Sequence, residues 1–79
     1  MAAREPDLSL LRPLFNKRRS DAGFTYEQLA EVSGVSRQTL LNIASGKYNG
    51  DLRTWIKLAQ AFNVTLDELL APLFGEDID

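Results

Sequence analysis

Two short helix-forming segments, separated by a turn with a single glycine, constrain this chain more than any other feature of its sequence. Residues 25–28, TYEQ, form a capping box, in which the threonine and glutamine side chains each bond a backbone N–H at the start of a helix. The box predicts a helix over residues 26–32. Gly34 follows, where a left-handed backbone, and therefore a tight turn, is easiest. Ser36 then predicts the cap of a second helix over residues 37–45.

The segment before this pair predicts a longer helix over residues 10–22, which Gly23 ends. Its start is ambiguous, because Pro13 fits the first turn of a helix but not its interior. A start near residues 10–12 satisfies this restriction, whereas an earlier start at Asp7 requires a kink. Apolar and polar residues nowhere alternate with a period of two, so the sequence predicts no strand.

Two further helices are predicted after Gly46. Asp51 is the expected cap of a helix over residues 52–62. The apolar residues of this helix recur at steps of three and four, which places them on one buried stripe: Leu52, Trp55, Ile56, Ala59 and Phe62. The run TLDE at residues 65–68 is a second capping box, and it opens a fifth helix that ends at Pro72 and Gly75. The predicted fold is therefore all-α, a compact domain of five helices.

Composition fits one small globular domain, with 44% hydrophobic and 25% charged residues among 79. We expect an ordered core over residues 8–74 and flexible ends at residues 1–7 and 75–79. Without histidine or cysteine, the chain has no disulfide and no imidazole or thiolate ligand, so we expect neither a metal nor a cofactor. The sequence contains no apolar run of about 20 residues and no signal peptide, which indicates a cytoplasmic protein without membrane contact.

The second helix of the short pair has the two faces that a recognition helix needs. In a helix-turn-helix, this helix docks by an apolar face and presents the other face to base edges in the major groove of DNA. Leu40 and Ile43 form the apolar face. The residues that point the other way are Arg37, Gln38, Leu41, Asn42 and Ser45. Arginine pairs with guanine, glutamine or asparagine pairs with adenine, and a leucine contacts the thymine methyl group.

Charge alone does not identify a nucleic-acid partner, because the formal net charge is −2. Basic residues nevertheless outnumber acidic ones in the first part of the chain, residues 1–50, whereas acidic residues dominate residues 51–79. Affinity for DNA depends on the charge of the face that meets phosphate. The basic run Lys17-Arg18-Arg19 is either part of such a face or an ordinary solvated surface.

Residues 24–70, FTYEQLAEVSGVSRQTLLNIASGKYNGDLRTWIKLAQAFNVTLDELL, resemble the helix-turn-helix domains of the phage Cro and repressor family, that is, lambda-repressor-like DNA-binding domains. The shared pattern includes LA, GVS and the final GK of the short pair, together with the ending NVTLDELL. The resemblance implies a five-helix DNA-binding domain. It also implies a transcriptional regulator, bacterial or phage, that binds a palindromic operator as a dimer.

The resemblance also implies a role for each matching residue. The main base-contacting positions of the family are occupied by Arg37, Gln38 and Asn42. Ser36 matches a cap residue that often meets phosphate or a base, and Tyr26 stands where a phosphate-binding glutamine is common. Positions that approach the DNA backbone are occupied by Ser45, Lys47 and Asn49. Leu41 is either a thymine contact or a contact with a partner protein.

The chain departs from the family pattern at two places. Many members pair an arginine at the end of the first helix with a glutamate near the end of the recognition helix. Arg19 occupies the first position, but Ala44 occupies the second, so we expect Arg19 to contact DNA phosphate or an acidic neighbour. The loop at residues 49–51 also lacks the basic residues that are frequent there, which removes phosphate contacts.

A single domain of this size reads only a half-site, so we expect two copies to bind together. The expected interface lies on the fifth helix and the tail, and it consists of Leu69, Leu73, Phe74 and Ile78. The alternative is that these residues only cover the first helix.

The function expected from these features is that of a sequence-specific regulator of transcription that binds double-stranded DNA, most simply a dimeric repressor associated with the nucleoid. Two alternatives stay open: an antitoxin or restriction-controller regulator, and a scaffold for protein–protein contacts that does not bind DNA. An enzyme is not expected, because Asp67 and Glu68 have no nucleophile, base or metal ligand nearby in the sequence. Trp55 and Phe62 are expected in the core rather than in a ligand site.

Overall fold

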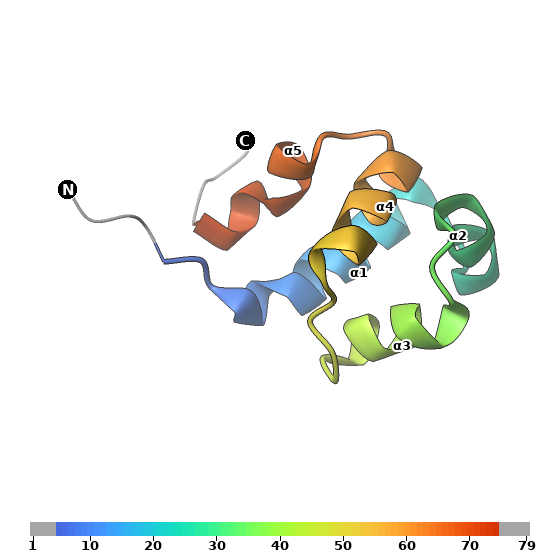
Figure 1. Cartoon of the computed structure of the whole chain (residues 1–79), viewed down its shortest axis with the longest axis horizontal. Coiled ribbons are helices and arrows are strands. Elements are labelled where there is room, and N and C mark those ends of the chain that lie inside the picture. Colours follow the sequence, from blue (N-terminus) through green and yellow to red (C-terminus); the bar gives the residue numbers. More distant parts are fainter. Residues whose placement is uncertain (1–4, 75–79) are drawn as a thin grey trace.

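The computed structural model describes residues 5–74, and within this range the chain forms helices and turns but no strand (Figure 1). The helices are α1 (Leu11–Ala22), α2 (Tyr26–Ser33), α3 (Arg37–Ser45), α4 (Leu52–Phe62) and α5 (Leu66–Leu70). Two short 3₁₀-helices flank them, η1 (Leu8–Leu10) and η2 (Ala71–Phe74). The predicted five-helix, all-α fold is confirmed. Residues 1–4 and 75–79, including Ile78 of the expected interface, lie outside the described residues, so the flexibility expected for the two ends is not tested there.

The α-helix α1 begins at Leu11, as predicted for a start near residues 10–12, and the 3₁₀-helix η1 precedes it in place of the kinked α-helix that an earlier start requires. The carboxylate of Asp7 caps η1 by accepting hydrogen bonds from the N–H and the hydroxyl of Ser9. Because α1 starts at Leu11, Pro13 falls in its first turn. There its missing N–H leaves no hydrogen bond unmade.

The predicted caps fix the starts of the other helices. Capping boxes open α2 and α5, with both reciprocal hydrogen bonds present at Thr25 and at Thr65. The side chains of Ser36 and Asp51 accept from backbone N–H groups in the first turns of α3 and α4. Each of these bonds spans only three residues, so the sequence determines it locally.

The core lies where α1 meets the other helices. Its largest fully buried side chains are Phe15, Leu29, Leu40, Ile43, Leu58 and Leu69. The ring of Phe15 meets that of Trp55 edge to face, with centroids 6.4 Å apart. Phe62 packs on the edge of this core against Phe24, with ring centroids 6.2 Å apart. Trp55 is therefore a core residue as expected, and Phe62 is partly buried at the edge of the core.

The predicted stripe on α4 is wrong at three positions. Leu58, which the prediction omitted, is fully buried. Ile56 is 41% exposed and Leu52 is 66% exposed. The buried side of α4 is centred on Trp55, Leu58 and Ala59, which leaves Ile56 on its flank and Leu52 at the open end of the helix.

The C-terminal interface predicted for two copies also needs correction. Leu69 is fully buried and Leu73 is 5% exposed, because α5 and η2 close one side of α1 and place these side chains in the core of the same chain. The backbone of Leu73 accepts a hydrogen bond from the N–H of Asp7, 2.8 Å, which fixes η2 beside η1. Phe74 is the one described member of the predicted patch that stays exposed, at 39%.

Candidate DNA interface

Helices α2 and α3 form a helix-turn-helix that the core holds from one side. Gly34 makes the turn with a left-handed backbone, φ 74°, and its N–H bonds the carbonyl of Ala30. In the turn, the hydroxyl of the buried Ser33 accepts from the N–H of Val35, 3.1 Å, and the Val35 side chain is buried. Leu40 and Ile43 dock α3 on α1 and α2, which turns the opposite face of α3 outward.

The predicted base-reading residues lie together on this outward face, but they are not equally accessible. Arg37 and Gln38, at the N-terminal end of α3, are exposed. Leu41 and Asn42 are half-buried, so Leu41 is less free than the sequence suggests. The N-terminal residues are the ones a recognition helix places deepest in the major groove.

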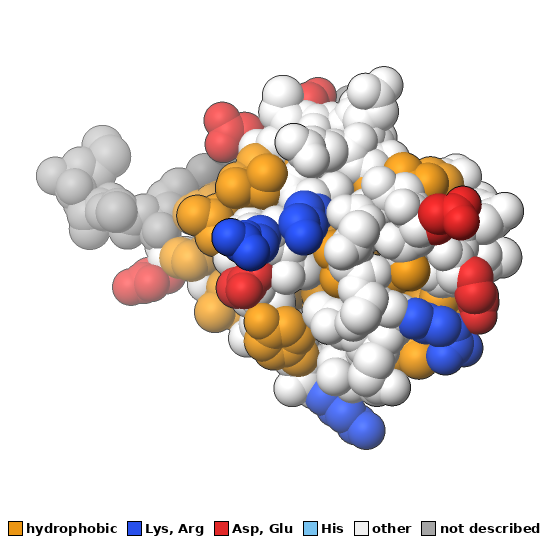
Figure 2. Space-filling model, turned by 45° about the vertical axis from the view of Figure 1, so that its right-hand side comes forward, with side chains coloured by type: hydrophobic (Ala, Val, Ile, Leu, Met, Phe, Trp, Pro, Cys, Tyr) orange, Lys and Arg blue, Asp and Glu red, His pale blue; other side chains and the backbone are white. Residues whose placement is uncertain are grey.

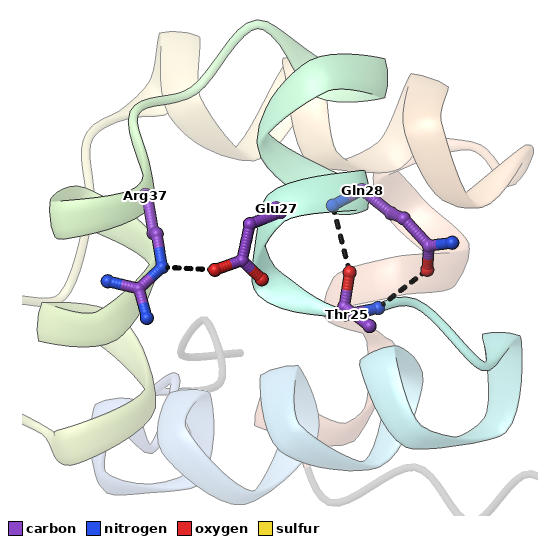
Figure 3. A network of polar contacts seen from close by, with 4 residues as sticks. All are labelled: Thr25, Glu27, Gln28 and Arg37. Carbon is purple, nitrogen blue, oxygen red and sulfur yellow. Dashed lines mark hydrogen bonds and ion pairs between the residues drawn. The ribbon is translucent and has the colours of Figure 1, made fainter.

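Arg37 makes an ion pair across the turn. Its Nε donates to Oε2 of Glu27, in the first turn of α2, at 2.8 Å (Figure 3). A backbone hydrogen bond at the start of α2, followed by the hydrogen bond and the charge of Arg37, holds the pKa of Glu27 below its usual value. Glu27 is therefore ionised at neutral pH and forms a full ion pair with Arg37.

Gln38 and Asn42 are also joined, one turn apart on α3. Nε2 of Gln38 donates to Oδ1 of Asn42 at 3.1 Å. The other half of each amide, the Oε1 of Gln38 and the Nδ2 of Asn42, has no hydrogen bond to any residue in the range 5–74. The pair thus presents one acceptor and one donor, which is the complement that the major-groove edge of adenine requires.

The residues predicted to meet the DNA backbone differ in how free they are. Ser36 uses its hydroxyl within the cap, accepting from the N–H of Thr39 and donating to the Thr39 hydroxyl. The hydroxyl of Ser45 donates to the carbonyl of Asn42, 3.2 Å. Lys47 and Asn49 are exposed in the loop after α3, and the Asn49 carbonyl accepts from Nε1 of Trp55, 2.7 Å, which ties this loop to the core.

Arg19, expected to contact DNA phosphate or an acidic neighbour, instead folds against its own chain. Its Nη1 donates to the carbonyl of Phe24 at 2.8 Å, its guanidinium lies 4.4 Å above the ring of the half-buried Tyr26, and its Nε is buried. Without a glutamate at position 44, the guanidinium folds onto the start of α2 and not onto α3. Tyr26 is the first residue of α2, and one face of its ring is covered by Arg19.

A side-chain hydrogen bond between α1 and α3 is made by Asn16, a residue that the sequence did not indicate. Nδ2 of Asn16 donates to the carbonyl of Ala44 at 3.1 Å and also to the carbonyl of Arg12. A backbone carbonyl leaves no trace in the sequence, so only the polar character of Asn16 on a largely apolar side of α1 could have indicated this role. The bond holds the recognition helix on α1 where the expected Arg–Glu pair is missing.

The basic run of α1 does not form a single patch. Lys17 makes an ion pair with Asp21, 2.9 Å, and both line a shallow groove beside Pro72 of η2 together with Arg18. On the face drawn in Figure 2, basic side chains likewise lie at separate places with acidic side chains close to several of them. On this face the chain therefore offers separate basic contacts and not a continuous basic field.

A family model described as helix-turn-helix matches residues 15–69, which include α2, the turn and α3. The chain belongs to this helix-turn-helix family. The match confirms the resemblance to phage-repressor domains that the sequence indicates, and it covers the whole of the interface described above.

Curated relatives of this chain carry regulator names. Two proteins of Archaeoglobus fulgidus, each described as an uncharacterized HTH-type transcriptional regulator, are 37% and 31% identical to it. The first alignment covers 75% of this chain and 84% of the relative, and the second covers 85% and 92%. A solved structure, described as a hypothetical transcription factor NHTF from Neisseria, has a TM-score of 0.67 and 27% identity, and the match covers 89% of this chain and 83% of that one.

Proposed function

We propose that this helix-turn-helix protein binds double-stranded DNA in a sequence-specific manner through α3 and acts as a repressor of transcription. One observation carries the proposal: Arg37, Gln38 and Asn42 stand together on the outward face of a helix whose other face is buried by Leu40 and Ile43. A DNA operator as partner places the site of action at the nucleoid, in the cytoplasm. A domain of this size on an operator represses by blocking the access of other proteins to it.

The roles of the residues follow from their chemistry. The terminal nitrogens of Arg37 pair with O6 and N7 of a guanine, and the joined amides of Gln38 and Asn42 read an adenine on a neighbouring step. Leu41, half-buried beside them, contacts a thymine methyl group. Lys47, and the hydroxyl of Tyr26, contact phosphate and set the position of the helix without reading sequence.

We propose further that two copies bind an inverted repeat, because one recognition helix reads too few base pairs for specificity. The contact between copies has to use side chains that the fold leaves exposed. Leu8 and Phe74 are such residues, and they directly follow the two residues joined by the hydrogen bond between Asp7 and Leu73. Sedimentation of the wild type and of Phe74→Glu tests this: the variant should be monomeric at concentrations where the wild type dimerises.

Selection of binding sites from random duplexes, followed by titration at several salt concentrations, tests the proposed function directly. The expected outcome is an inverted repeat with a guanine in each half-site, and an affinity that falls as salt rises. A protein that selects no sequence and binds no duplex at low salt would instead be a scaffold for protein–protein contacts. The net charge of −2 is the observation that favours this second function.

A further inference from the structure

We propose that Glu27 is a specificity-determining residue of the DNA interface, and that it acts by positioning Arg37 for a guanine. The inference rests on the proposed function, since it concerns the same recognition helix. Glu27 is not on that helix. It belongs to α2, ten residues before Arg37 in the sequence, and the tight turn at Gly34 brings the two side chains together.

The geometry of the ion pair favours positioning over blocking. Glu27 engages Arg37 through Nε, at the inner edge of the guanidinium, with N···O 2.8 Å. In Figure 3 the two terminal nitrogens of Arg37 point away from the carboxylate. Neither of them has a hydrogen bond to another residue within 5–74. These are the nitrogens that a bidentate pair with guanine uses.

The exposure of Arg37 explains why an ion pair is needed to orient its guanidinium. The side chain of Arg37 is 54% exposed and that of Glu27 is 69% exposed, so burial does not fix the orientation of the guanidinium. A free arginine side chain populates many rotamers and must lose that freedom when it binds a base. A hydrogen bond at Nε restricts the rotamers before DNA arrives, and it leaves the terminal donors unused. Glu27 therefore favours guanine over the bases that a mobile arginine could reach by other rotamers.

The carboxylate has a second effect of opposite sign. DNA phosphates repel a negative charge at the start of α2, so Glu27 lowers the affinity for every duplex, whatever its sequence. A residue that lowers general affinity while raising discrimination gives a distinctive pattern on mutation. Mutation of a residue that only stabilised the fold would lower the general affinity and the discrimination together.

Glu31 offers a matched control on the same helix. It lies one turn further along α2, is exposed, and makes no ion pair with any residue in the described range. Glu31→Gln removes the same charge from the same helix without touching Arg37. The comparison of Glu27→Gln with Glu31→Gln therefore separates the positioning effect from the loss of one negative charge.

The experiment measures, by fluorescence anisotropy, the affinity of the full chain for the selected operator, for operators in which one guanine is replaced, and for an unrelated duplex. Glu27→Gln replaces the charged acceptor at Nε by a weaker neutral one. It should lower the discrimination at one guanine by up to about fivefold, the upper end of the range for an exposed ion pair. It should also tighten the binding to the unrelated duplex. Glu31→Gln should leave the discrimination unchanged. In the Arg37→Ala background, Glu27→Gln should cause no further loss of discrimination.

Any other outcome contradicts either the positioning role of Glu27 or the proposed function itself. If Arg37→Ala lowers discrimination but Glu27→Gln does not, or if Glu27→Gln lowers it equally without Arg37, the positioning role of Glu27 is wrong and the proposed function stands. If the wild type does not discriminate between duplexes, the proposed function fails and this inference fails with it. Circular dichroism checks the fold of each variant. Should Glu27→Gln not fold, Glu27→Asp keeps the charge but withdraws the carboxylate by one methylene, so it should lower the discrimination without tightening the binding to the unrelated duplex.

Discussion

At the scale of single residues, we propose that the interface combines side chains that read bases with side chains that only meet phosphate, and mutation should separate the two kinds. We expect Arg37→Ala and Gln38→Ala each to cost about 1–3 kcal/mol of binding free energy on the selected operator, and to relax the preference at one base pair. The measurement is a set of titrations against operators with single base replacements. Discrimination equal to that of the wild type in both variants would contradict the assignment of these residues.

Lys47 should behave differently. Because it is exposed just after α3 and is expected to neutralise a phosphate, Lys47→Ala should weaken binding to all duplexes alike. The slope of log affinity against log salt should fall by about 0.9, the effect of one lost phosphate contact. Lys17→Ala is the control, since Lys17 pairs with Asp21 beside η2 and is not expected at the interface. A change in base preference for Lys47→Ala would place its side chain in the groove instead.

At the scale of elements, the loop between α3 and α4 is held by one close packing contact. Gly50 has φ 79°, and a Cβ added there would lie 2.6 Å from Nε1 of Trp55, the group that bonds the Asn49 carbonyl. Gly34 has φ 74° but open space around it. Gly34→Ala should therefore show only the cost of a left-handed backbone, about 1–2 kcal/mol.

Gly50→Ala should add to this cost the displacement of Trp55, a further contribution of about 1–3 kcal/mol typical of overpacking. Urea unfolding of the two variants gives the comparison, because both replace a glycine of the same backbone conformation. Equal stabilities of the two variants would mean that the loop moves away from Trp55 without cost.

A structural feature can be predicted from the sequence when it depends on residues close together in the chain, and not when it depends on contacts between helices. The starts of α2, α3 and α4 agree with the prediction because each depends on a cap three residues long. The prediction of which side of α4 is buried does not agree with the structure. Whether Ile56 or Leu58 is buried depends on how α4 is rotated against α1 and α2. Burial of Leu69 and Leu73 likewise follows from the open side of α1, which no local pattern contains.

The candidate site follows the same rule. The outward face of α3 could be predicted, because Leu40 and Ile43 fix the rotation of the helix. The ion pair of Glu27 with Arg37 could not, since it needs the angle between two helices as well as their spacing. Its residues are visible in the sequence as opposite charges on either side of the turn, and that signal alone is weak.

At the scale of the whole molecule, the absence of histidine sets the response to pH. Without histidine, the sequence has no type of side chain whose ordinary pKa lies between about pH 6 and pH 8, so stability should change little there. Hydrogen bonds from the side chain and N–H of Thr54 hold the pKa of Asp51 low, and those from the N–H and side chain of Thr65 hold the pKa of Glu68 low. Since folding lowers both values, the stabilisation is present at neutral pH and is lost as the pH falls through the folded pKa.

Thermal unfolding followed by circular dichroism checks this response. The midpoint should be flat in the neutral range and should fall below about pH 4. Asp51→Asn keeps a capping side chain at the start of α4 but removes one titrating group, so its midpoint should fall less in acid. A slope in the neutral range for the wild type would contradict the expectation.

The hydrogen bond between Asp7 and Leu73 has a practical consequence for work with this protein. It fastens the first and last helical turns of the described chain, η1 and η2, to each other, whereas α3 docks on α1 and α2 (Figure 1). A fluorescent label or an added domain would therefore lie at the same end of the molecule whether it is attached at η1 or at η2. The same adjacency makes the fold a candidate for circular permutation, with a short linker that joins the chain across η1 and η2.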